Sequence, residues 1–256
     1  MKTIPVFVML MFLCIPSRNS ADIGHLKLQR REDTKKHELT TIQKKLIVDK
    51  HNELRRVVNP PAADMLYMSW DNDLEKLATS YSRKCIFEHN PDRALEGYNY
   101  IGENLHVSKG HGITNEYGAN AVISWDNEKH DYTYATRYCT PGKPCGHYTQ
   151  TAWAKSYKVG CGMTTCDIID VFGAIWTNAI LFTCNYAPGR NSGSQAIYTA
   201  GTPCSKCPKY DKCVEKLCTN TTRDSSGSIR MTSANSWKFA FIFTVILQYG
   251  IHMFDD

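Results

Sequence analysis

The stretch that decides the fold runs from Pro144 to Gly162 and reads "PCGHYTQTAWAKSYKVGCG". Two sets of side chains alternate over 147–154, which is the period of a strand with two unlike faces. The alternation predicts a strand there, with one face formed by His147, Thr149, Thr151 and Trp153. The same period recurs over 159–165 and 180–186, so the second half of the chain is expected to form a sheet.

The first half of the chain has helical periodicity instead. Residues 37–59 place four side chains at helical spacing, namely Ile47, His51, Leu54 and Val58. Asp71 can cap a second helix, and a third is expected over about 115–129. Helices that precede strands indicate an α+β layered domain and not an alternating βαβ fold.

The N-terminal segment 1–20 has the features of a secretory signal peptide: an early lysine, an apolar run and then small residues. Cleavage near Ser17 or Ala21 would remove Cys14 and leave ten of the 11 cysteines. An even number of cysteines in an oxidising compartment predicts five disulfides. The formal net charge of +5 is spread along the chain, which argues against nucleic-acid binding.

The C-terminal segment 237–256 is hydrophobic and follows a polar stalk, 221–236. This order is typical of a glycosylphosphatidylinositol-anchor signal, with candidate attachment points at Ser225, Ser226, Gly227 and Asn235. A membrane span is the alternative, although the apolar run is shorter than usual and carries two polar residues. Asn220, in "NTT", is the glycosylation sequon. The protein is therefore expected in the secretory pathway, on the extracellular face of the plasma membrane or secreted.

Four motifs occur in order: "HNELR" (51–55), "GEN" (102–104), "GHYTQTAWAKS" (146–156) and "LFTCNYAPGRN" (181–191). On these motifs the chain resembles the CAP superfamily of cysteine-rich secretory, antigen 5 and pathogenesis-related proteins, and within it the vertebrate glioma-pathogenesis-related branch. The resemblance implies a three-layer α-β-α sandwich with a central antiparallel sheet over residues 38–195. A short cysteine-rich hinge, 196–220, follows this domain.

The resemblance also implies the cysteine pairing, which spacing alone leaves open. The implied pairs are Cys85–Cys166, Cys161–Cys184, Cys139–Cys145, Cys204–Cys213 and Cys207–Cys218. Without the resemblance, "CSKC" at 204–207 with two later cysteines is also compatible with zinc, although the secretory route and the short loop argue against it. A further bridge found in relatives is absent, because Ile101 and Ala187 occupy its two positions.

The superfamily has a cleft lined by two histidines and two acidic residues, which by motif are His89, Glu103, Glu128 and His147. The resemblance implies that the two imidazoles could bind Zn²⁺ weakly, while the carboxylates orient them. Each residue also has a structural interpretation. His147 could be a core strand histidine, Glu103 could brace a loop, Glu128 could be a solvated helix residue, and His89 could belong to an ordinary loop.

Three functions remain open at this point: an extracellular module that binds a protein partner, a sterol or lipid carrier, and a metal-dependent hydrolase. A hydrolase would need a nucleophile within hydrogen-bond reach of a base. Ser156 is nine residues from His147 along the predicted strand and its exit, and the usual nucleophile and zinc-protease motifs are absent. We therefore expect a binding protein and not an enzyme.

Overall fold

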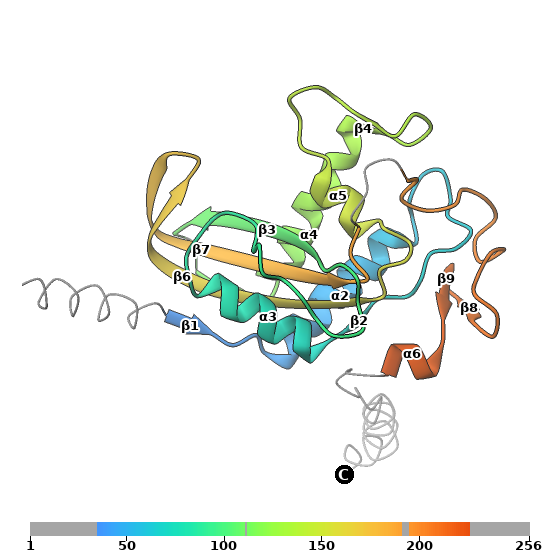
Figure 1. Ribbon diagram of the computed structural model, residues 1–256, viewed down its shortest axis with the longest axis horizontal. Coiled ribbons are helices and arrows are strands. Elements are labelled where there is room, and N and C mark those ends of the chain that lie inside the picture. Colours follow the sequence, from blue (N-terminus) through green and yellow to red (C-terminus); the bar gives the residue numbers. More distant parts are fainter. Residues whose placement is uncertain (1–34, 111, 191–194, 226–256) are drawn as a thin grey trace, which may run out of the picture.

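The computed structural model describes residues 35–110, 112–190 and 195–225 (Figure 1). The predicted signal peptide and the hydrophobic segment 237–256 lie outside these residues. The described elements, in chain order, are β1 Lys35–His37, α2 Thr41–Arg55, β2 Ser69–Trp70, α3 Asn72–Ser82, β3 Gly102–Lys109, α4 Tyr117–Asn127, η1 Glu128–Asp131, β4 Tyr132–Thr133, β5 Tyr138–Cys139, α5 Gly146–Thr151, β6 Lys158–Val171, β7 Ala174–Ala187, β8 Lys212–Val214, β9 Leu217–Thr219 and α6 Thr221–Ser225.

The central sheet has the strand order β1-β6-β7-β3, and β2 also pairs with β6. The long strands β6 and β7 form an antiparallel hairpin, and β3 adds to β7 from Gly102 opposite Tyr186 to Lys109 opposite Ala179. The short strand β2 is the exception because it pairs in parallel. The expected strands 159–165 and 180–186 are therefore present, and both are longer than the alternation indicated.

Helices cover both faces of this sheet. A Cβ built on Gly160 would lie 2.2 Å from the backbone nitrogen of Glu75, so the β6 backbone packs directly against α3. On the other face, Phe182 packs with Ile47 of α2 and Trp125 of α4. Because side chains alternate along a strand, α3 lies opposite α2 and α4. The expected α+β three-layer fold is confirmed (Figure 1).

The helices begin where side chains satisfy their first backbone N–H groups. Thr40 and Gln43 form a reciprocal capping box at α2, and Asp71 accepts the N–H groups of Asp73 and Leu74 at α3, as its position predicts. Of the predicted stripe on α2, Ile47 and His51 are buried, together with the polar Asn52 and Arg55.

The segment 146–151 corrects the sequence analysis, because it is the helix α5 and not a strand. Thr149 N–H donates to the carbonyl of Cys145, and Ala152 N–H donates to that of Tyr148. The backbone N–H groups of His147 and Tyr148 donate to the carboxylate of Glu128, 3.0 and 3.1 Å away. A carboxylate from another element thus accepts hydrogen bonds from the first backbone N–H groups of the helix. Local alternation does not reveal such a tertiary contact.

Five disulfides join the described cysteines, and they are the five pairs that the resemblance implies: Cys85–Cys166, Cys139–Cys145, Cys161–Cys184, Cys204–Cys213 and Cys207–Cys218. Cys161 and Cys184 lie directly opposite each other on β6 and β7 and are fully buried. Ile101 and Ala187, which replace the missing bridge, pack in one apolar cluster with Leu74. Apolar packing thus occupies the place of that bridge.

His51 is a structural histidine, as its helical spacing favours. Its Nδ1 donates to the carbonyl of Ile47 at 2.8 Å, and its Nε2 accepts from the hydroxyl of Tyr186 at 3.0 Å. Burial lowers its pKa from 6.5 to about 4, the backbone hydrogen bond to Ile47 acts in the opposite direction, and the charge of Arg55 lowers the pKa further.

A pH dependence of stability follows from this buried histidine. Between pH 6.5 and about 4 the unfolded chain binds the proton that the folded chain excludes. The contribution of His51 is therefore complete above pH 6.5 and lost as the pH falls through 4, by an amount on the order of 3 kcal/mol. Urea unfolding at stepped pH gives the free energy of unfolding as a function of pH. In this window its slope should be shallower for His51→Gln than for the wild type, whereas the exposed control His130→Gln should follow the wild type. Equal slopes for the two variants would contradict the assignment.

Candidate functional site

The first histidine of the predicted cleft lies in the loop after α3 and is held by β3. The carboxylate of Glu103 accepts from His89 Nδ1 at 2.9 Å and from the backbone N–H of Asn90 at 2.9 Å. Its other oxygen accepts from the side-chain amide of Asn185 at 3.2 Å. The Glu103 side chain is 0% exposed, whereas the His89 side chain is 56% exposed. Glu103 thus braces the loop through the backbone of Asn90 and also holds the imidazole of His89.

The second histidine lies at the start of α5. Glu128 Oε1 accepts from His147 Nδ1 at 2.5 Å, while Oε2 accepts the two backbone N–H groups already described. The His147 ring stacks on Trp125 with centroids 6.1 Å apart. Its side chain is 30% exposed and that of Glu128 is 11% exposed. His147 is therefore not a sealed core histidine, and Glu128 is not a solvated helix residue.

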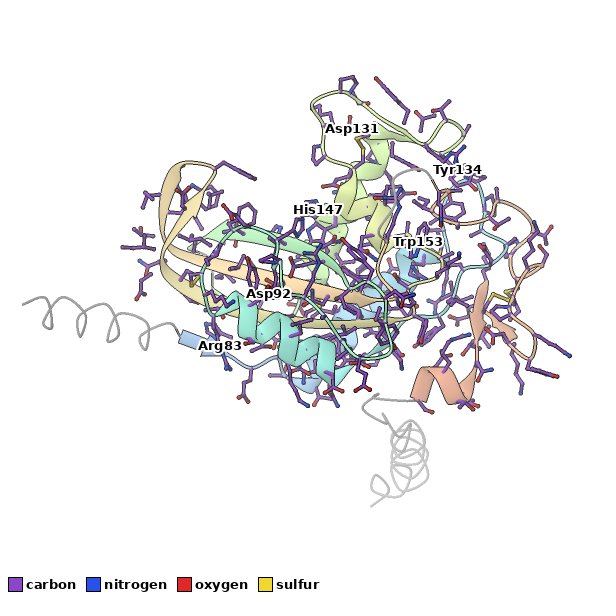
Figure 2. All side chains as sticks on the ribbon, in the orientation of Figure 1. Arg83, Asp92, Asp131, Tyr134, His147 and Trp153 are labelled. Atoms are coloured by element: carbon purple, nitrogen blue, oxygen red, sulfur yellow. A yellow bond between two sulfur atoms is a disulfide. The ribbon has the colours of Figure 1, made fainter. Side chains whose placement is uncertain are left out.

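Neighbouring residues of β3 contact the two histidine–carboxylate pairs. Glu103 holds His89, and the amide of the next residue, Asn104, donates to the backbone carbonyl of His147 at 3.1 Å. In Figure 2, His147 of α5 is drawn above the sheet, and Asp92, in the loop that carries His89, is labelled near α3. Within the described ranges, no hydrogen bond joins a side chain of one pair to a side chain of the other.

The chemistry of both pairs fits a divalent metal ion. A carboxylate that accepts from Nδ1 fixes the tautomer in which Nε2 is the free ligand atom, as is usual for histidines that bind metals. Among the described residues, the one place where three or more potential ligand atoms lie within 4.8 Å of one another is Cys204, Cys207 and Cys218. Those sulfurs are all consumed in disulfides. Any metal held by the four predicted residues would therefore depend on the two imidazoles, with water at the remaining positions.

Two asparagines support the site without having been predicted. Asn104 and Asn185 are fully buried; Asn104 contacts the backbone of His147, and Asn185 contacts the carboxylate of Glu103. Asn104 is the last residue of "GEN", but nothing in the sequence indicated its contact with His147. That contact depends on α5, which the alternation predicted as a strand. His106, two residues further along β3, is close enough to His147 for its pKa to be lowered, first by burial and then by that charge.

The hydroxyl of Ser156 is not available as a nucleophile. The residue is fully buried. Its hydroxyl donates to the carbonyl of Pro188 at 2.6 Å and accepts from the side-chain amide of Gln150 at 3.0 Å. Ser156 therefore fastens the end of the α5 segment to the end of β7.

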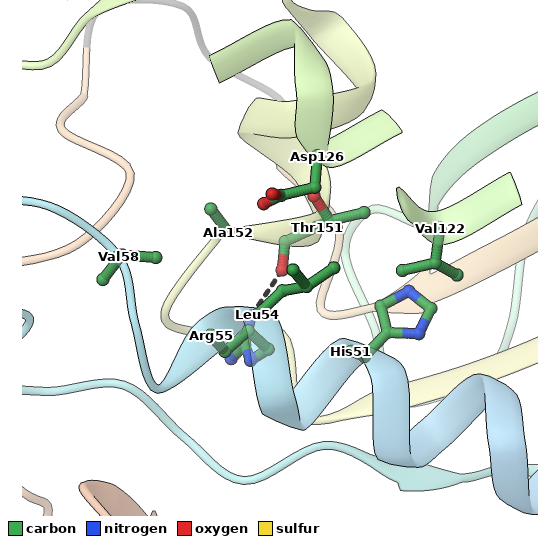
Figure 3. A pocket seen from close by; sticks show the side chains of 8 residues that line it. All are labelled: His51, Leu54, Arg55, Val58, Val122, Asp126, Thr151 and Ala152. Carbon is green, nitrogen blue, oxygen red and sulfur yellow. Dashed lines mark hydrogen bonds between the residues drawn. The ribbon is translucent and has the colours of Figure 1, made fainter. Parts of the chain in front are cut away.

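Figure 3 shows the space between α2, α4 and α5 with the side chains that line it. It is lined by His51, Leu54, Arg55, Val58, Val122, Asp126, Thr151 and Ala152, and these side chains leave no room in it for a water molecule. A neighbouring depression of about 330 Å³ is open to solvent and includes Tyr132, Tyr134 and Tyr148 in its lining. The interior of the helical layer thus holds no preformed chamber for an acyl chain or a sterol at this position.

No helix of the described residues is long and apolar enough to cross a membrane. Asn220 precedes α6, and its side-chain oxygen accepts from the N–H of Thr222 at 3.0 Å. Ser225 ends that helix. The other candidate attachment points, Ser226, Gly227 and Asn235, lie outside the described residues.

Comparison with known proteins agrees with this architecture. The chain is 39% identical over 180 residues to human (Homo sapiens) peptidase inhibitor 16, a match that covers 70% of this chain and 37% of that protein. It is 41% identical over 181 residues to GLIPR1-like protein 1 of Bos taurus, which covers 69% and 70% of the two chains. The chain thus spans little more than a third of the length of the first relative.

Two solved structures are similar as well. Na-ASP-1 is 28% identical with a TM-score of 0.58 over 72% of this chain and 48% of its own. NaASP2, crystallised with Zn²⁺, is 25% identical with a TM-score of 0.52 over 71% and 97% of the two chains. The family model described as the cysteine-rich secretory protein family, CAP, matches residues 48–186. With this match, the disulfide-braced sandwich and the two histidine–carboxylate pairs, the chain belongs to the cysteine-rich secretory protein (CAP) family.

Proposed function

We propose that this protein is an extracellular binding module whose cleft takes a divalent metal ion, Zn²⁺ in the first instance, without catalysing a reaction. The observation that carries the proposal is the repeated histidine–carboxylate pair. His89 and His147 each give Nδ1 to a largely buried carboxylate and are left with Nε2 as the ligand atom. The ion would supply a fixed positive charge and open coordination positions at the surface.

The donor set favours binding over hydrolysis. Two neutral imidazoles are good zinc ligands, but catalytic zinc sites usually have three protein ligands. Both carboxylates already accept at least two hydrogen bonds, from imidazole, backbone or amide donors, so neither is free to act as a general base. The engaged hydroxyl of Ser156 supports the same conclusion.

The family supports an extracellular role. Peptidase inhibitor 16 and GLIPR1-like protein 1 are similar in sequence over the domain, and five disulfides suit an oxidising compartment. We infer an extracellular protein as the partner. The space beside Arg55, which has no room for a water molecule, gives no support to the sterol or lipid carrier, and anchorage through 237–256 stays a prediction from the sequence.

Zinc titration by calorimetry tests the proposal. The wild type should take up one Zn²⁺, and the double variant His89→Ala/His147→Ala should show no saturable binding. Glu103→Gln, which keeps the shape of the side chain but removes its charge, should weaken binding by about 10- to 100-fold. The exposed His130→Ala is the matched control and should bind as the wild type does. Full zinc binding by the double variant would refute the site.

A further inference from the structure

The strongest unassigned feature is the compact, lysine-rich end of the hinge, residues 204–219, which we call the hinge knob. Two disulfides, Cys204–Cys213 and Cys207–Cys218, tie its loop together within a span of 15 residues. The strands β8 and β9 form a small hairpin inside it. The hinge knob lies at the opposite end of the molecule from the turn between β6 and β7 (Figure 1).

The hinge knob is fixed to the domain and does not hang from it. Lys206 N–H donates to the carbonyl of Ala63 at 2.9 Å, and Cys218 N–H donates to that of Met65 at 2.8 Å. The carbonyl of Cys218 in turn accepts from Tyr67 N–H at 2.9 Å. Charges on this knob are therefore presented by a rigid support, which lowers the entropy lost on binding.

The hinge knob carries an excess of positive charge. Its two acidic residues are both occupied, since Asp211 pairs with Arg223 at 2.6 Å and Glu215 pairs with Arg56 at 2.7 Å. Four lysines remain, all exposed and none in an ion pair of the described chain: Lys206, Lys209, Lys212 and Lys216. Four ammonium groups on one small disulfide knot, none of them in an ion pair within the described residues, form a concentrated positive surface.

The backbone of the hinge knob adds a second argument. Glu215 and Lys216 form the β8–β9 turn with φ of 48° and 68°, where Asn and Gly are strongly preferred. Tyr210 has φ of 74°, is 81% exposed, and lies under Lys209 Nζ, 4.9 Å from the ring centroid. Charged and aromatic side chains thus occupy positions where folding favours small residues. Such positions are typical of binding sites.

We propose that the hinge knob binds a sulfated polysaccharide of the extracellular matrix or cell surface. Lysine ammonium groups bind sulfate as point charges, and release of counterions from a polyanion drives association. The exposed ring of Tyr210 offers a flat apolar face to a sugar ring. Anionic lipid is concentrated in the cytoplasmic leaflet, so a disulfide-bonded extracellular protein meets dense negative charge chiefly as polysaccharide.

The test uses the full chain and a defined heparin oligosaccharide. The quadruple variant Lys206→Gln/Lys209→Gln/Lys212→Gln/Lys216→Gln should lose at least about tenfold in affinity at physiological salt, with a flatter dependence of log Kd on log salt. The matched control makes the same exchange at four exposed lysines elsewhere, Lys45, Lys76, Lys84 and Lys143. It has the same net charge and should stay within about twofold of the wild type. Equal losses in both variants, or none in the first, would overturn the assignment.

Two further measurements separate charge from folding and sugar from lipid. Lys216→Gly places glycine at a left-handed position, so its Tm should be equal to or above that of the wild type while its heparin affinity falls. Retained affinity in this variant would remove Lys216 from the site. Phosphatidylcholine vesicles containing phosphatidylserine should bind more weakly than heparin. Tighter binding to the vesicles would replace the polysaccharide with a lipid surface.

Discussion

Replacement of Arg55 by methionine is expected to lower the free energy of unfolding by about 3–5 kcal/mol. Arg55 is 2% exposed, and no carboxylate is paired with it in the described chain. Its guanidinium instead donates to the carbonyls of Leu66, Thr151, Trp153, Ala154 and Ser156. Methionine retains much of the apolar bulk but leaves these buried acceptors without their donor, which is costly in the interior.

The position of Arg55 links stability to the cleft. Four of its acceptors lie in the segment just after His147, so the guanidinium fastens the region that carries α5. Urea unfolding with intact disulfides measures the effect, and Arg83→Met, at an exposed arginine, is the control. The control should change stability by less than about 0.5 kcal/mol. A loss below 1 kcal/mol for Arg55→Met would contradict the role assigned to this residue.

Replacement of both Cys85 and Cys166 by serine should have the second large effect, a loss of about 4 kcal/mol in the free energy of unfolding. This disulfide joins residues 81 positions apart, so its loss frees much more of the unfolded chain than loss of Cys139–Cys145, which spans 6 positions. Chain-entropy reasoning gives about 4.5 kcal/mol for the first and about 2.4 kcal/mol for the second. Cys85 lies four residues before His89, so the first variant should also weaken zinc binding.

The Cys139→Ser/Cys145→Ser variant is the matched comparison, because it removes the same number of sulfurs. Denaturant unfolding under non-reducing conditions gives both free energies. Loss of the long bridge should lower the free energy of unfolding by roughly 2 kcal/mol more than loss of the short one. If the short bridge proves equally stabilising, native contacts and not loop closure account for the contribution of these disulfides.

Periodicity predicted the larger elements of this fold. The apolar spacing of Ile47 and His51 located α2, Asp71 marked the start of α3, and alternation located the long hairpin. The same alternation failed at 146–151, because the backbone there is held by the carboxylate of Glu128, which comes from the end of another helix. Arg55 was also missed: a basic residue in the last turn of a helix is usually exposed, and its acceptors become visible only in three dimensions.

The four candidate site residues were predicted from motifs and not from the local sequence around each of them. Nothing around His89 or Glu128 marks either residue as part of a site, and their partners Glu103 and His147 lie 14 and 19 residues away. The family resemblance supplied the four residues. The structure adds how they are joined: Glu103 holds His89, Glu128 holds His147, and Asn104 and Asn185 each contact one of the two pairs.

Metal binding by the two histidines is tested most directly by anomalous diffraction at the zinc edge from crystals of the protein grown with Zn²⁺. We expect one strong peak about 2.0–2.1 Å from Nε2 of both His89 and His147, with water at the other positions. A cleft that contains no peak, or zinc held at some other cluster while both imidazoles point away from it, would contradict the central claim.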